Sequence, residues 1–151
     1  MSGLHNPVFY AALMLVVGLG IPIFAALNGE LGSKLQSPAL AATIALSVGV
    51  VVSIGFLLLS GGIAKPDPQS PIPLYSYLGG LFVVFYILGI TWVAPRFGVG
   101  NAVTFVLLGQ LVSMAVIDHY SLLGAAHHPI SAQRFAGLLL MAIGVFLSVR
   151  R

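Results

Sequence analysis

Five long apolar stretches, almost free of charge, constrain this chain more than any other feature of its sequence. The hydrocarbon core of a bilayer is roughly 30 Å thick and requires about 20 apolar residues from a helix that crosses it. Each stretch approaches that length, and its hydrophobic residues run continuously rather than alternating, which favours helices over barrel strands. The predicted membrane spans are 8–27, 39–59, 74–94, 102–117 and 135–149.

Composition excludes the main soluble classes. Of the 151 residues, 59% are hydrophobic and 6% are charged, whereas an average soluble domain is roughly 25% charged. Six Lys/Arg and three Asp/Glu cannot cover the large surface of so small a protein in water. The net charge of +3 comes without a basic cluster and gives little support to nucleic-acid binding, and the absence of cysteine excludes disulfides and thiolate metal sites. We expect an all-α integral membrane protein in which residues 1–151 form a single domain of five transmembrane helices.

The connections between the predicted spans are short and contain helix breakers. Asn28-Gly29 and Ser37-Pro38 bracket the first connection, and Pro38 suits the first position of a helix. Four prolines within 61–73 predict that this segment is an extended polar loop. We expect a tight turn over 95–98, and we expect Ser131 to cap the fifth helix.

Lys and Arg are expected mainly on the cytoplasmic side of a membrane protein. An odd number of spans places the two ends of the chain on opposite sides. The side of the N-terminus then carries two basic residues and the other side four, namely Lys65 and Arg134 against Lys34, Arg96, Arg150 and Arg151. This excess favours an outside N-terminus, but it is small enough to permit insertion in both orientations.

Two polar side chains lie deep in predicted spans. Gln110 falls near the middle of the fourth span, and an amide without a partner in lipid is strongly unfavourable. It must therefore face protein, a cavity or a ligand, which leaves open an interhelical hydrogen bond or a binding site. The Tyr86 hydroxyl also needs a partner and is a candidate to line a cavity.

The first span carries Gly18, Gly20 and Pro22 near its middle. Pro22 removes one helical hydrogen bond, and the glycines permit unwinding or close approach, so we expect an interruption here. In transporters such a broken span points to a binding site, while a packing kink is the alternative. Beyond the span, Glu30 is expected to pair with Lys34 at headgroup level.

Asp118 and His119 end the fourth span. A carboxylate at a helix C-terminus opposes the helix dipole, which favours a partner, and His119, His127, His128 and Arg134 are the candidates. Either this is an interfacial pair that fixes the following loop, or Asp118 and His119 serve proton coupling. A metal site built from Asp118, His119, His127 and His128 has no recognised ligand spacing, and we expect no metal.

Small residues form a stripe along the fifth span, at Gly137, Met141, Gly144 and Ser148. Such a stripe permits close contact between helices. It could pack within the chain or against a second copy, and we favour the second copy.

Several motifs together resemble the YdcZ-type family of small membrane proteins in the drug/metabolite transporter superfamily. They run in the family's order over nearly the whole chain: Asn28-Gly29-Glu30-Leu31-Gly32, Gly79-Gly80, Gly109-Gln110-Leu111 with Asp118-His119, then Gly137 and Gly144-Val145. The resemblance implies a five-helix, half-size protein that works as a dimer and corresponds to half of a ten-helix inverted-repeat transporter fold. The family often has Gln four residues before Asn28, where this chain has Phe24.

Together these features predict a protein of the bacterial inner (plasma) membrane that transports a small organic molecule by alternating access. It would act as a homodimer, and its two copies could be antiparallel. Transport would be secondary, coupled to an ion or proton, and would need no cofactor. The pathway residues are Gly18, Gly20, Pro22, Asn28, Tyr86 and Gln110. The alternative is an accessory or structural membrane protein without a transported substrate. An enzyme is not expected, because no set of nucleophile, base and orienting residue stands out.

Overall fold

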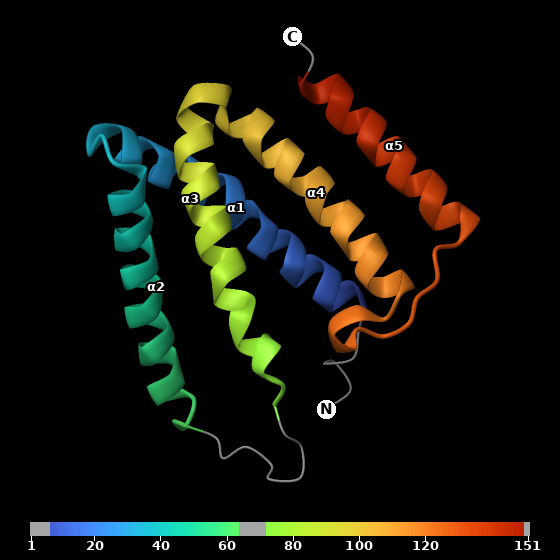
Figure 1. Ribbon diagram of the computed structural model, residues 1–151, viewed down its shortest axis with the longest axis horizontal. Helices are drawn as coiled ribbons and strands as arrows, with labels where there is room; N and C mark the ends of the chain where they lie inside the picture. Colours follow the sequence, from blue (N-terminus) through green and yellow to red (C-terminus); the bar gives the residue numbers. More distant parts are fainter. Residues whose placement is uncertain (1–6, 64–71, 150–151) are drawn as a thin grey trace. The chain divides into compact units, whose positions relative to one another are not determined.

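The computed structural model describes residues 7–63 and 72–149, which form helices and connecting turns (Figure 1). Five of the helices are long and apolar enough to cross a membrane, as predicted. The chain divides into two compact units, residues 1–96 and 97–151, and each is described by itself. Most of the predicted loop over 61–73, namely 64–71, lies outside the described residues, as do the basic residues Lys65, Arg150 and Arg151.

The elements follow the predicted order, with two short 3-10 helices added. They are α1 (Pro7–Lys34), α2 (Pro38–Leu59), η1 (Leu74–Leu78), α3 (Gly79–Phe97), α4 (Val99–His119), η2 (Leu122–Gly124) and α5 (Ala132–Val149). In the first unit α1 packs on α2 and also meets α3, and in the second α4 packs on α5.

Helix α1 is longer than its apolar stretch predicts. Asn28 and Gly29, expected to begin the first connection, are helical and buried, and α1 continues to Lys34. Glu30 and Lys34 form the expected ion pair at 2.7 Å, one helical turn apart, which supports this added length. The prediction that Asn28-Gly29 starts a loop is therefore wrong, because both residues serve the packing of α1.

The turn between α1 and α2 is closed by local hydrogen bonds. Gln36 adopts a left-handed conformation (φ 51°), and the Ser37 N–H donates to the Gly32 carbonyl at 3.1 Å, as at many helix C-termini. The Ser37 hydroxyl then accepts the Leu40 N–H at 3.2 Å, and Pro38 occupies the first turn of α2 as predicted. The connection thus shrinks to three residues, 35–37.

The expected tight turn over 95–98 is reduced to Gly98. Helix α3 includes Pro95 and runs to Phe97, and α4 begins at Val99. Gly98 has φ +91°, a conformation that glycine adopts without the steric cost of a side chain. The connection between α4 and α5 agrees with the prediction, since the Ser131 hydroxyl accepts the Arg134 N–H at 3.2 Å and caps α5.

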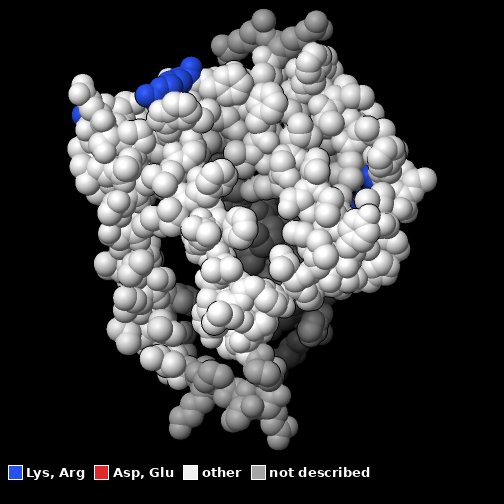
Figure 2. Space-filling view, in the orientation of Figure 1, with Lys and Arg blue, Asp and Glu red and all other residues white. Residues whose placement is uncertain are grey.

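Most large apolar side chains of the described residues lie on the outside. Val16 is 65% exposed and Phe56 72%, whereas the buried residues are mainly alanines. The face drawn in Figure 2 is almost entirely white, with small areas of blue. So extensive an apolar surface is unfavourable in water and suits a protein covered by lipid.

Candidate functional site

Helices α1 and α3 are joined by a buried polar pair. Asn28 is 4% exposed and Thr91 1%. The Asn28 amide donates to the Thr91 hydroxyl, which in turn donates to the Ile87 carbonyl at 2.6 Å. The sequence predicts Asn28 as a residue of a substrate pathway but does not predict Thr91 as its partner. The signal was available, because Thr91 is an isolated hydroxyl within an apolar stretch.

Small residues allow this contact. A Cβ added to Gly32 would lie 2.8 Å from the Thr91 methyl group, and one added to Gly29 would lie 3.3 Å from the Pro95 ring. Real Cβ atoms essentially never reach the first of these distances. Gly29 and Gly32 therefore let the backbone of α1 approach α3, as small residues do in membrane helix pairs.

A cavity of about 280 Å³ lies between α1 and α3 and is lined by Gly20, Phe24 and Tyr86 together with aliphatic side chains. The Tyr86 ring lies 6.4 Å from that of Phe24. The Tyr86 hydroxyl is buried and has no hydrogen-bond partner in the described part of the chain. A buried hydroxyl without a partner is unfavourable, so this group can gain free energy from a polar atom brought to it.

A second cavity, of about 300 Å³, lies between α1 and α2 and is lined by Asn28. Phe24 lines both cavities. In the sequence, Phe24 stands out only as a departure from the resembled family. Its position between the cavities follows from tertiary packing, which the local sequence does not specify.

The predicted interruption of α1 is not found. The helix continues through Gly18, Gly20 and Pro22, and a Cβ at either glycine would meet no atom within 4 Å. Pro22 removes a single hydrogen bond, which a helix of 28 residues accommodates without unwinding. Of the three residues, Gly20 alone lines one of the cavities described above.

Gln110 lies on α4, in the second unit. Its side chain is exposed, and the described residues provide no hydrogen bond to it. The structure thus gives no support to an interhelical hydrogen bond between Gln110 and α5. Gln110 and the other predicted pathway residues belong to different units of the chain.

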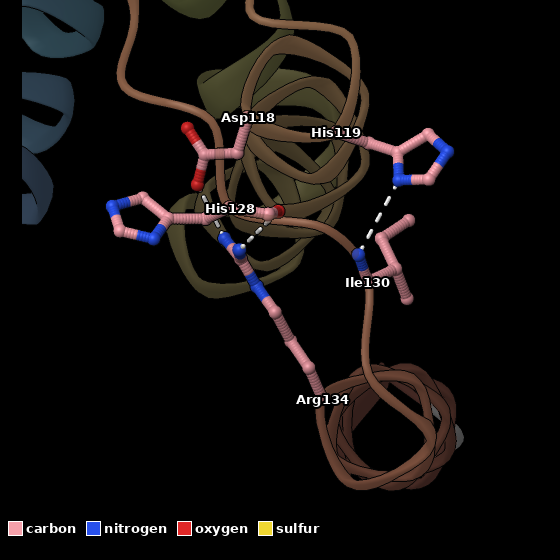
Figure 3. A network of polar contacts seen from close by, with 5 residues as sticks. All are labelled: Asp118, His119, His128, Ile130 and Arg134. Atoms are coloured by element: carbon pink, nitrogen blue, oxygen red, sulfur yellow. Dashed lines mark hydrogen bonds and ion pairs between the residues drawn. The ribbon is translucent and has the colours of Figure 1, made fainter.

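Asp118 finds its partner in Arg134, one of the four predicted candidates. The carboxylate and guanidinium are 2.5 Å apart, with side chains about one quarter exposed (24% and 28%). Figure 3 shows Arg134 reaching from α5 to both the Asp118 carboxylate and the His128 carbonyl, the latter at 3.4 Å. The His128 N–H also donates to the Asp118 carbonyl at 3.0 Å. This arrangement fixes the loop between α4 and α5.

The histidines of this loop point to different partners. The His119 ring extends away from Asp118, and its Nδ1 accepts the Ile130 N–H at 3.3 Å (Figure 3). His127 shares a hydrogen bond of 3.0 Å with Ser121. Within the described residues no group of three or more His, Asp and Glu side chains could hold a metal ion.

The small-residue stripe of α5 is not engaged by α4. Met141, Gly144 and Ser148 are exposed, and a Cβ at Gly137 or Gly144 would meet nothing within 4 Å. The residue of α5 that is buried is Val145. The stripe therefore remains available to another helix.

Five apolar helices with cavities between them define a multi-pass membrane protein. The chain matches the family described as "Putative inner membrane exporter, YdcZ" over residues 9–147, and it belongs to that family. This confirms the resemblance seen in the sequence and identifies a multi-pass protein of the inner membrane. The family points to a transporter rather than an enzyme. No curated protein and no solved structure matches the chain significantly.

Proposed function

We propose that this protein is a secondary transporter that moves a small organic molecule by alternating access. The observation that carries the proposal is the buried Tyr86 hydroxyl, which has no partner in the described chain and lies beside an apolar cavity. Ligand sites of this kind combine a mainly apolar lining with a few polar groups. We therefore expect a substrate with apolar surface and one group that hydrogen bonds to Tyr86.

The proposed pathway runs along α1. Gly20, Phe24 and Tyr86 line one cavity and Asn28 lines the next. Since Phe24 borders both cavities, rotation of its ring would connect or separate them. Gly18 and Pro22 would weaken α1 enough for it to bend during transport, and Gln110 would contribute a further polar contact from α4.

Proton coupling is assigned to Asp118 and His119. Protonation of Asp118 would weaken its ion pair with Arg134, and a doubly protonated His119 could not accept the Ile130 N–H. Either event would release the loop that joins α4 to α5. Asp118→Asn should therefore reduce uptake driven by a pH gradient, and unchanged uptake would exclude Asp118 as the coupling group.

We propose that two copies assemble as a homodimer, with the stripe of α5 as the contact. The stripe is unoccupied by α4 and consists of small or flexible residues that permit close approach. Oppositely inserted copies would supply the inverted symmetry on which alternating access depends.

The transport proposal is tested by Tyr86→Phe, which keeps the ring and removes the hydroxyl. Liposomes containing the purified protein are screened for accumulation of a panel of fluorescent lipophilic amines under a pH gradient. Loss of one hydrogen bond worth about 1 kcal/mol should weaken transport of an accepted amine about fivefold. Tyr77→Phe is the control, because Tyr77 is 69% exposed and lines neither cavity. Equal transport by both variants and the parent would refute a role for the hydroxyl.

A second candidate, an accessory protein without a substrate, is favoured by one observation. Both acidic residues of the described chain, Glu30 and Asp118, are held in ion pairs, so either carboxylate must give up its cationic partner to carry a proton. Gln110→Leu separates the two functions. A transporter would lose activity while its dimer persists, whereas a structural contact would lose dimer yield.

A further inference from the structure

A third cavity, of about 390 Å³, differs from the two along α1 in its polar lining. It lies at one end of the first unit, where the turn between α1 and α2 meets the last turn of α3. Its lining includes Gly32, Ser33, Gln36, Pro38, Pro95 and Arg96. The other two cavities are lined almost entirely by apolar side chains.

Arg96 gives this cavity a positive charge. Its guanidinium lies 4.9 Å from the centre of the Trp92 ring and donates to the Trp92 carbonyl at 2.5 Å. No acidic side chain of the described residues pairs with it, since Glu30 binds Lys34 and Asp118 binds Arg134. A guanidinium has five N–H donors, so most remain for a ligand, and contact with the indole ring orients the group.

The cavity also offers neutral donors. The Ser33 hydroxyl and the Gln36 amide line it, and the described residues make no hydrogen bond to either side chain. Gln36 is held in position by its left-handed backbone and by the closed turn around it. One fixed cation with nearby hydroxyl and amide donors is an arrangement that suits an oxyanion.

The position of the cavity at the ends of spanning helices indicates which oxyanion it would meet. The turn follows one spanning helix and precedes another, which places it at the level of the lipid headgroups. Trp92 beside it is of the residue type that is enriched at that level. Phosphate is the common anion there, and arginine binds it through paired N–H donors.

We propose that this cavity binds the phosphate of an anionic phospholipid headgroup, with Arg96 as the main contact and Ser33 and Gln36 as additional donors. The glycerol and acyl chains would then lie along the exposed apolar surface of the first unit. This site adjoins the proposed transport pathway, because Thr91 lines the cavity and is bonded to Asn28, but the proposal does not depend on transport.

The test is lipid retention by the purified full chain in detergent, measured by native mass spectrometry. Phosphatidylglycerol and phosphatidylcholine with the same acyl chains are added in parallel. We expect preferential retention of phosphatidylglycerol by the parent, about tenfold weaker retention by Arg96→Gln, and an intermediate loss in Arg96→Lys, which keeps charge without paired donors. Lys34→Gln is the matched control, because it removes one positive charge at the same end of the unit without touching the cavity.

Equal losses of phosphatidylglycerol retention in Arg96→Gln and Lys34→Gln would show that only the net positive charge matters, and would overturn the proposal. If Arg96→Gln does not fold, the double variant Ser33→Ala, Gln36→Asn keeps the cation and should still weaken retention severalfold. Asn tolerates the left-handed conformation at position 36. Inorganic phosphate is tested in a second arm by thermal stability. Arg96-dependent stabilisation by phosphate, without Arg96-dependent retention of either lipid, would overturn the lipid assignment in favour of a soluble phosphate.

Discussion

Replacing Gly32 with alanine tests the contact between α1 and α3 directly. The new Cβ would lie 2.8 Å from the Thr91 methyl group, 3.5 Å from the Pro38 Cα and 3.6 Å from the Ala41 Cβ. Thr91 cannot yield by rotating freely, because its hydroxyl is bonded to both Asn28 and the Ile87 carbonyl. Either these hydrogen bonds break or the two helices move apart.

The expected magnitude follows from a matched pair of variants. Gly49 lies in α2, where an added Cβ would meet nothing within 4 Å. Both variants replace a helical glycine with alanine, so the difference between them reports mainly the steric cost at Gly32. Overpacking of this kind costs about 1 to 3 kcal/mol, which corresponds to a roughly 5- to 150-fold change in the ratio of folded to unfolded protein.

The assay is equilibrium unfolding in mixed micelles with increasing dodecyl sulfate, followed by the fluorescence of Trp92, the single tryptophan of the chain. Trp92 follows Thr91 directly and should report separation of α1 from α3. We expect Gly32→Ala to unfold at a lower dodecyl sulfate fraction than Gly49→Ala. Equal stability of the two variants would show that α1 and α3 do not approach as closely as Gly32 and Thr91 indicate.

Three further predictions concern hydrogen bonds and topology. Thr91→Val keeps the shape of the side chain but leaves the buried Asn28 amide without its acceptor; the same unfolding assay should show a loss of about 0.6 to 1.7 kcal/mol, and no loss would contradict the pair. Ser131→Ala removes the cap of α5 and should cost about 0.5 to 2 kcal/mol, measured as a lower thermal midpoint in detergent, whereas an unchanged midpoint would argue against the cap. Because the chain has no cysteine, Leu35→Cys and Ser60→Cys place single thiols at opposite ends of α2. For dual insertion we expect an impermeant maleimide to label each variant to about one half in intact cells. Labelling of only one of the two variants would exclude an inverted homodimer.

The helices were predictable from the sequence because hydrophobicity and length alone define a membrane span. Their ends were less predictable. The polar Asn28 and flexible Gly29 indicate a break locally, yet both are buried in α1 because Thr91 and Pro95 pack against them. Such contacts lie more than 60 residues apart in sequence. At Pro22 the local sequence predicts a break that the structure does not have, since a long helix tolerates a proline that would interrupt a shorter one.

For the candidate site, the sequence predicts which polar side chains require partners but not which partners they find. Chemistry requires that Asp118 and Tyr86 find partners, but it does not name them. Arg134 could be chosen among four candidates only after the loop had folded back on the end of α4. The sequence does not predict Arg96 as a site residue, because a single arginine beside a proline is common at a helix end. The polar cavity beside Arg96 forms only when α1, α2 and α3 come together.

Several polar groups and one packing surface lack partners within their own unit, which indicates that further helices or ligands contact them. Among the described residues, Tyr86 and Gln110 have polar atoms without partners, and the α5 stripe is not covered by α4, its neighbour in the same unit. In lipid such amides and hydroxyls are unfavourable, because no water replaces the missing hydrogen bonds. A packing helix alone would cover the stripe but would not satisfy a hydroxyl enclosed beside an apolar cavity. A second copy together with a bound substrate would meet all three requirements, which is why we propose a dimeric transporter rather than an accessory protein.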